Sequence, residues 1–372
     1  MSSGKIIEPD AGFIAKLKSS GSESLKKCFQ CANCTSICGV SEGVIAFPRR
    51  EMILAQWGQR EKLIYSPGVW LCHQCGDCTE QCPRGADPSE VLQAVREMSY
   101  QEFATPSLLA KMFSNRGMLI PLLAVPIAVL LLVVMMVNGL SIPEGDIVFS
   151  KMMPIAVIDS VFLPVALFAL ITAFMGVKKF WNGMRTHYPR EVKPNVVSGL
   201  LKTVTDIILH RQFGKCEKNK GLQLSHLLTF FGFLALFITT NMVMLYHYVF
   251  EKNTPLDLLD PVKILGNAGA IASFIGVLWI IYRRSTAQKE AGKPTYFDWT
   301  FIIVLFLTIV TGIGAESARL AGMALTAYSV YFTHLVLVFF LFAYMPFSKF
   351  AHILYRTTAM VFANGLEKTK SS

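Results

Sequence analysis

The stretch CHQCGDCTEQCP, residues 72–83, decides how the rest of this chain is interpreted. Its cysteines follow the spacing C-x2-C-x2-C-x3-C, and the stretch CFQCANCTSIC at residues 28–38 repeats that spacing. The pattern is typical of thiolates that hold a cubane [4Fe–4S] cluster, with three ligands close together and a fourth from a distance. Pro83 completes the second motif, whereas Gly39 stands at the matching position after the first.

The two motifs predict two [4Fe–4S] clusters that exchange their fourth ligands. In two-cluster ferredoxins the last cysteine of one motif ligates the cluster of the other. The expected ligands are Cys28, Cys31, Cys34 and Cys82 for cluster 1, and Cys72, Cys75, Cys78 and Cys38 for cluster 2. The alternatives are structural zinc, which favours separate C-x2-C pairs, and disulfides, which need an oxidising compartment. The remaining cysteine, Cys216, receives no role.

The composition indicates a membrane protein with a soluble part. Hydrophobic residues make up 53% of the 372 residues and charged residues only 16%, which is too apolar for an ordinary soluble domain. Six apolar segments follow the cysteine motifs, and a bilayer-spanning helix needs about 20 such residues. The expected spans are 118–137, 155–177, 222–250, 264–282, 299–315 and 328–347.

Helical segments surround the cysteine motifs. Pro48 precedes a helix expected over 49–57, which Gly58 ends. After the second motif, Asp87 reads as an N-cap and Pro88 as a first-turn residue of a helix that continues to about Phe103. This pattern favours an α-helical ferredoxin domain.

Charged loops predict the orientation of the chain in the membrane. The segment 178–220 carries ten Lys or Arg, and Arg283, Arg284, Lys289 and Lys293 follow the fourth span. The opposite loops are acidic, so the positive-inside rule places both termini on the cytoplasmic side. The membrane is expected to be the cytoplasmic (inner) membrane. The net charge of +10 therefore does not indicate a nucleic-acid partner. The apolar residues within 196–208 recur at helical spacing, which predicts an amphipathic helix on the cytoplasmic membrane surface.

Four histidines at or near membrane depth predict haem binding. The third span carries His226 and His247, and the sixth carries His334 with His352 just beyond its apolar run. The intervals of 21 and 18 residues keep each pair on one helix face near opposite membrane surfaces. Pairing by depth gives His226 with His352 on the cytoplasmic side and His247 with His334 on the outer side. Each pair would supply both axial ligands of a haem b.

The other histidines and the membrane-edge charges are secondary candidates. His210 is the alternative to His352, His187 is expected in a solvated loop, and His73 is expected to pack against or tune a cluster. A quinone site needs a proton-exchanging group beside a haem. Asp159, Glu316 and Arg319 are outer-side candidates for it, with helix-end charges in the headgroup region as the alternative reading.

The cysteine motifs and paired histidines together resemble a known fusion. The N-terminal third resembles the small iron–sulfur subunit of heterodisulfide reductase. The remainder resembles its membrane cytochrome b partner, which is similar to the gamma subunit of respiratory nitrate reductase. The joined arrangement is similar to the QmoC family, the membrane subunits of quinone-interacting membrane-bound oxidoreductases. The resemblance implies two [4Fe–4S] clusters, two b haems, menaquinone as membrane substrate, QmoA-like and QmoB-like flavoprotein partners, and adenylylsulfate reductase as the soluble electron partner.

The sequence thus predicts a mainly α protein with an N-terminal α-helical ferredoxin domain and a six-helix transmembrane cytochrome b bundle. The expected domains cover residues 1–115 and 116–356, with a polar tail over 357–372. The expected function is electron transfer between the quinone pool and a cytoplasmic flavin and iron–sulfur complex. The alternatives are a membrane anchor without haem, a heterodisulfide reductase subunit, or a transporter, whose broken-helix repeats are not evident.

Overall fold

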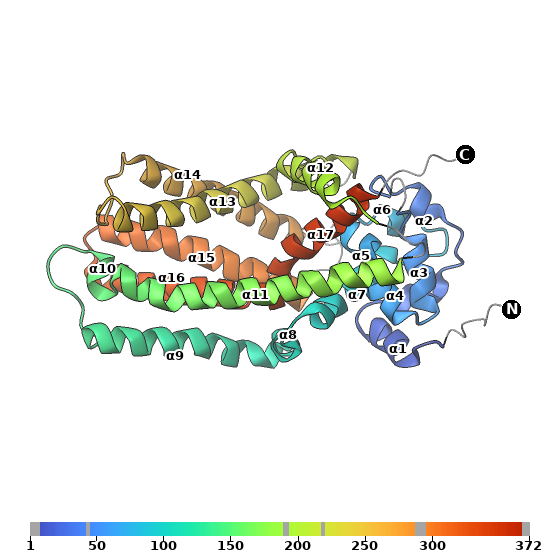
Figure 1. The fold of residues 1–372 in the computed structure, drawn as a ribbon, viewed down its shortest axis with the longest axis horizontal. Coiled ribbons are helices and arrows are strands. Elements are labelled where there is room, and N and C mark those ends of the chain that lie inside the picture. The colour runs from blue at the N-terminus through green and yellow to red at the C-terminus, as the bar shows by residue number, and fades with distance from the viewer. Residues whose placement is uncertain (1–7, 42–44, 189–192, 217–219, 287–294, 367–372) are drawn as a thin grey trace.

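The computed structural model describes residues 8–41, 45–188, 193–216, 220–286 and 295–366, and these ranges contain helices and no strands. The predicted mainly α fold is therefore confirmed. A group of short helices that carries both cysteine motifs lies at one end of a bundle of long helices (Figure 1). The first helix of the chain and the last one, α17, both approach this end (Figure 1).

Seven α-helices and the 3₁₀ helix Glu23–Lys27 form the described part of the cysteine-rich end. The longest, α7, shows why these residues fold as they do: the Asp87 side chain accepts a hydrogen bond from the Glu90 N–H, and Pro88 occupies the first turn. Its apolar face is buried in the core, as the sequence predicts. The helices are α1 (Ala11–Ser19), α2 (Asn33–Ser36), α3 (Arg49–Gln56), α4 (Arg60–Ile64), α5 (Pro67–Leu71), α6 (Asp77–Glu80) and α7 (Pro88–Phe103).

Among the residues that the structure describes, six helices are long and apolar enough to cross a membrane, which confirms the six predicted spans and a multi-pass membrane protein. They are α9 (Leu119–Asn138), α11 (Ile155–His187), α13 (Lys220–Tyr248), α14 (Pro261–Thr286), α15 (Tyr296–Leu320) and α16 (Ala324–Ala343). The shorter α8 (Ser107–Phe113) and α10 (Phe149–Met152) lie before α9 and α11.

Helix α11 continues well past its predicted end at Val177 and reaches the cysteine-rich end. Two glycines, Gly176 just before the predicted end and Gly183 on the extension, leave room for tyrosine side chains. A Cβ at Gly183 would lie 2.0 Å from Tyr65 Cδ1, and one at Gly176 would lie 2.5 Å from the Tyr355 hydroxyl. Phe180, which lies between the two glycines, is fully buried. This packing extends the helix beyond its apolar run.

The chain beyond α16 differs from the expected polar tail. Two 3₁₀ turns lead into α17 (His352–Gly365), which buries Tyr355, Ala359 and Phe362 and packs against α5 and α12. The expectation was wrong for residues 357–365 because their partners are distant in sequence, whereas 367–372 lie outside the described residues. The domain boundaries at 115 and 356 stay predictions.

The predicted amphipathic segment forms α12 (Val196–Ile208). Gly199 faces α17, where a Cβ would lie 2.3 Å from the Val361 carbonyl oxygen. The apolar side chains of Val197, Leu201 and Ile208 stay exposed. Its contact with a membrane surface stays a prediction. Of the basic loop residues, Arg190, Lys218, Lys289 and Lys293 lie outside the described residues.

Candidate iron–sulfur and haem sites

The two cysteine motifs repeat in structure as well as in sequence. Gln30 and Gln74 occupy the same motif position and both have positive φ angles, 60° and 54°. The Gln30 N–H donates to Cys28 Sγ at 3.4 Å, and the Gln74 N–H donates to Cys72 Sγ at 3.3 Å. The left-handed turn therefore curls the backbone around each first cysteine, and donors of this kind lower the cost of holding charge on a ligating sulfur.

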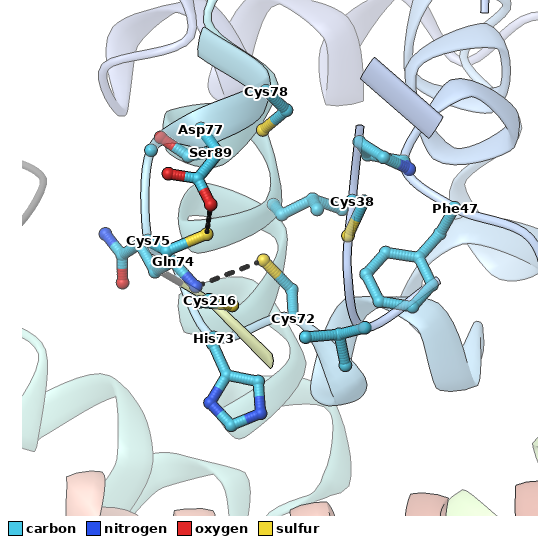
Figure 2. Close-up of a pocket in the computed structure, with 14 residues that line it drawn as sticks. Cys38, Phe47, Cys72, His73, Gln74, Cys75, Asp77, Cys78, Ser89 and Cys216 are labelled. Atoms are coloured by element: carbon cyan, nitrogen blue, oxygen red, sulfur yellow. Dashed lines mark hydrogen bonds between the residues drawn. The ribbon is translucent and has the colours of Figure 1, made fainter. Parts of the chain in front are cut away.

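The four cysteines predicted for cluster 2 line one cavity of about 20 Å³ (Figure 2). Cys38 reaches it from the first motif and joins Cys72, Cys75 and Cys78. Four convergent sulfurs fit the donor set of a [4Fe–4S] cluster. Burial raises the pKa of the Cys38 thiol to about 11, so iron has to displace its proton on binding. The ligand assignment stays a prediction.

The cluster 1 residues lie closer to the surface. Cys28 and Cys31 lie near enough to Cys34 to raise the pKa of its thiol, although burial raises that pKa more. Cys31 is exposed. Among the described residues no hydrogen bond joins Cys82 to these three cysteines. The two motifs are linked beside them, because Asn33 Nδ2 donates to the carbonyl oxygen of Gln81 at 2.6 Å.

The structure adds Cys216, which the sequence reasoning left without a role. It follows the turn Phe213–Lys215 in the segment between α12 and α13, and it lines the cluster 2 cavity. The sequence signal that could have found it is Gly39, which stands where the second motif has Pro83. Gly39 leaves room for the Lys215 carbonyl oxygen, next to Cys216.

Four histidines line a second cavity of about 140 Å³. His226 and His352, the pair predicted for the cytoplasmic haem, both face it, and so do His210 and His73. His210 Nε2 lies 3.2 Å from His226 Nδ1. His210 is therefore a neighbour of the pair, whereas the sequence offered it only as a substitute for His352.

The ring nitrogens of His352 and His334 fit axial ligation. His352 Nδ1 donates to the Lys349 carbonyl oxygen at 2.7 Å, and His334 Nδ1 donates to the Thr308 carbonyl oxygen at 2.9 Å. Within the described ranges their Nε2 atoms have no hydrogen-bond partner. Metal-ligating histidines show this pattern, with one nitrogen free and the other held by the protein. Burial lowers the pKa of His352 to about 3, which keeps its imidazole in the neutral, ligating form.

The structure does not bring the outer pair together by any described contact. His334 packs on α15, where a Cβ at Gly312 would lie 3.0 Å from its Cε1. His247 keeps a buried Nδ1 that has no partner within the described ranges.

The three quinone-site candidates on the outer side are paired with other side chains. The Tyr248 hydroxyl donates to Asp159 at 2.7 Å. Glu316 accepts from Arg319 at 2.8 Å and pairs with Lys263 at 2.9 Å. Helix-end ion pairing is therefore the role that the structure shows for Glu316 and Arg319.

His73 separates the two cavities and lines both of them. It directly follows Cys72, and its Nε2 lies 2.5 Å from Arg356 on α17. Arg356 also donates to the Cys72 carbonyl oxygen at 3.3 Å. Burial and the Arg356 charge lower the pKa of His73 well below 6.5. One neutral imidazole and one guanidinium therefore lie between the thiols and the paired histidines.

The expectation of a solvated His187 was wrong. This residue lies in the last turn of α11, where its ring stacks on Tyr65 with centroids 5.5 Å apart. The stack forms because α11 extends to the cysteine-rich end, which the length of the apolar run does not reveal.

These features define a membrane-associated iron–sulfur electron-transfer protein. The family model described as a 4Fe-4S dicluster domain matches residues 24–86. The model described as Citrate utilization protein B matches residues 109–372, more than half of the chain. The chain therefore belongs to the Citrate utilization protein B family.

Individual relatives are similar to larger or smaller parts of the chain. The Citrate utilization protein B of Escherichia coli is 28% identical over 309 residues, covering 78% of this chain and 80% of that protein. A heterodisulfide reductase subunit-like protein of Archaeoglobus profundus is 38% identical over 93 residues. A subunit of the H(2):CoB-CoM heterodisulfide,ferredoxin reductase of Methanothermobacter thermautotrophicus is 32% identical over 99 residues.

The two heterodisulfide reductase relatives match about a quarter of the chain. The matches cover 25% and 26% of this chain and about half of each relative, 50% and 54%. They support the predicted likeness to heterodisulfide reductase, whereas membership of the QmoC family stays a proposal. No solved structure is significantly similar to the chain.

Proposed function

We propose that this protein passes electrons between menaquinol or menaquinone and a cytoplasmic flavin and iron–sulfur complex. The observation that carries the proposal is that one residue, His73, lines both the cavity of cysteines and the cavity of histidines. The two cavities therefore adjoin, so that redox groups held in them would be neighbours. The protein would work as a subunit of a quinone-dependent oxidoreductase in the cytoplasmic membrane, with both termini in the cytoplasm.

Each side chain in this path has a distinct task. The two iron–sulfur clusters and the b haems would supply one-electron chemistry when bound. Cys38, Cys72, Cys75 and Cys78 would hold cluster 2, while His226 and His352 would hold the cytoplasmic haem. The Lys349 carbonyl oxygen orients the His352 ring, because it accepts the Nδ1 proton and turns Nε2 toward the cavity.

The opposite end of the path is at the protein surface. Cys28, Cys31, Cys34 and Cys82 would hold cluster 1. Cys31 is exposed, and 66% of the neighbouring Phe29 is exposed, with Arg84 4.0 Å above its ring. Electrons would leave or enter there, to QmoA-like and QmoB-like flavoproteins and onward to adenylylsulfate reductase. His247 and His334 would hold the second haem on the outer side.

A redox difference spectrum of the purified full-length protein tests this function. Dithionite-reduced minus oxidised spectra with a pyridine haemochrome assay should show haem b, and a menaquinol analogue should reduce it. His352→Ala and His226→Ala should each remove the same haem. His187→Ala is the matched control, because this histidine stacks on Tyr65 and lines neither cavity. A folded preparation that holds its clusters but no haem would instead favour the membrane anchor.

A second candidate function follows from the similarity to the Escherichia coli protein, which covers 80% of that relative. In this case the same electron path would serve citrate utilisation instead of adenylylsulfate reductase. The two candidates differ in the partner that exchanges electrons with cluster 1. Pull-down of the full-length protein from its native membranes, after growth with and without citrate, would distinguish them by the partner recovered.

A further inference from the structure

Cys216 lies deep in the cluster 2 cavity although it belongs to neither cysteine motif. Only 2% of this residue is exposed. Its sulfur lies within 4.8 Å of both Cys75 Sγ and the Asp77 carboxylate (Figure 2). The cavity therefore contains five cysteine sulfurs, one more than a cubane cluster needs from the protein.

The approach of Cys216 depends on a glycine in the first motif. A Cβ at Gly39 would lie 2.3 Å from the Lys215 carbonyl oxygen, which is backbone and has little freedom to move. Gly39 directly follows the predicted ligand Cys38. The glycine that makes the first motif differ from the second is therefore the residue that admits the backbone next to Cys216.

A second contact anchors the same segment to the histidine cavity. The Phe213 ring lies 5.1 Å from the His73 ring and 4.9 Å from the His226 ring, measured between centroids. The segment from Phe213 to Cys216 thus touches both cavities. These two anchors hold the Cys216 sulfur against Cys75.

The chemistry of this contact follows from which thiols would lose their protons. The four predicted ligands would bind iron as thiolates, whereas Cys216 is not one of them and a cysteine S–H is a hydrogen-bond donor. Reduction of a cluster adds negative charge that spreads onto its sulfurs. A hydrogen bond to a ligating sulfur therefore stabilises the reduced form and raises the reduction potential.

We propose that Cys216 is a positioning residue whose S–H donates a hydrogen bond to the Cys75 sulfur and raises the reduction potential of cluster 2. This inference rests on the proposed function, because it requires clusters in both motifs. Cys31, the counterpart of Cys75 in the first motif, is exposed. No cysteine outside the two motifs lies beside Cys31 in the part of the chain that the structure describes. This difference between the motifs would make cluster 2, which lies beside the histidine cavity, easier to reduce than cluster 1.

The test is a potentiometric titration of the full-length protein followed by electron paramagnetic resonance, with iron content measured in parallel. Cys216→Ala should lower the midpoint potential of cluster 2 and leave that of cluster 1 unchanged. Cys216→Ser, which keeps a donor, should shift it less. Gly39→Ala keeps Cys216 but displaces the Lys215 backbone, and it should shift the potential in the same direction. Ser36→Ala is the matched control, because the Ser36 hydroxyl donates to the Asn33 carbonyl oxygen and not to a sulfur.

Three outcomes separate the possibilities. An unchanged cluster 2 potential in Cys216→Ala overturns the inference. Loss of four irons in both Cys216→Ala and Cys216→Ser overturns it as well, since Cys216 would then be a ligand. If the alanine variant does not fold, the serine variant decides. Replacing S–H by O–H should still change the midpoint potential of cluster 2 and leave that of cluster 1 unchanged, and no change would overturn the inference. Wild-type protein without clusters would instead refute the proposed function.

Discussion

Replacing Asp298 by Asn tests the buried ionic contact that joins the cysteine-rich end to the bundle. Asp298 lies in the first turn of α15 and is 2% exposed. It pairs with Lys349, lies 3.6 Å from Arg284 of α14, and accepts from Gln93 of α7 at 3.3 Å. One carboxylate therefore joins α15 to α14, to α7 and to the turn that carries Lys349.

The expected cost follows from the charges that the substitution leaves behind. Removing one partner of a buried ion pair costs about 3–5 kcal/mol, because the other charge stays buried and unpaired. The side chains of Lys349 and Arg284 are 20% and 22% exposed. Because both side chains retain partial exposure, we expect the lower end, about 3 kcal/mol. Asp298 is the third residue of a capping box with Thr295, and an asparagine side-chain oxygen can still accept from the Thr295 N–H, so the substitution removes the charge and keeps this bond.

Denaturant titration of the full-length protein in detergent, followed by tryptophan fluorescence, measures this cost. Asp298→Asn should lower the midpoint with an unchanged slope, which indicates a change in stability alone. Lys349→Met in the same background should restore part of the loss, because it removes an unpaired cation. A loss below about 1 kcal/mol, or strictly additive single and double variants, would refute the reasoning.

Three further predictions test packing, pH dependence and the path between the cavities. Gly183→Ala should destabilise the protein by about 1–3 kcal/mol through overpacking against Tyr65. Gly314→Ala is the control, because its Cβ would lie 3.4 Å from Val330, and it should not destabilise the protein by overpacking. Thermal unfolding of both variants measures the difference. Burial raises the pKa of Glu102, but the hydrogen bond and charge of Lys179 and the charge of Arg60 outweigh it and leave that pKa below 4.5. Glu102→Gln should therefore lower the free energy of unfolding by about 1 kcal/mol at neutral pH. The difference from wild type should vanish as the pH falls below 4.5 and through the lower pKa of the folded state. Denaturant titrations across pH measure this difference. His73→Leu should leave iron and haem content unchanged while slowing electron transfer between haem and cluster in stopped-flow reduction. Unchanged transfer would count against a path through His73.

Several features of this protein could be predicted from the chain alone, because each depends on neighbouring residues. The six spans follow from the length of apolar runs, which the bilayer thickness sets. The start of α7 follows from Asp87 and Pro88, whose hydrogen-bonding and backbone preferences are local. The same holds for the repeated turn at Gln30 and Gln74, since it comes from the cysteine spacing.

Tertiary packing decided the rest. Cys216 meets Cys75, and His210 meets His226, only because the segment after α12 folds back over the cysteine-rich end, and no periodicity encodes that return. Helix α17 and the extension of α11 are stabilised by partners in α12, α5 and α4. At such contacts two distant surfaces have to fit each other, as Gly39 fits Lys215, and neither surface alone carries the information.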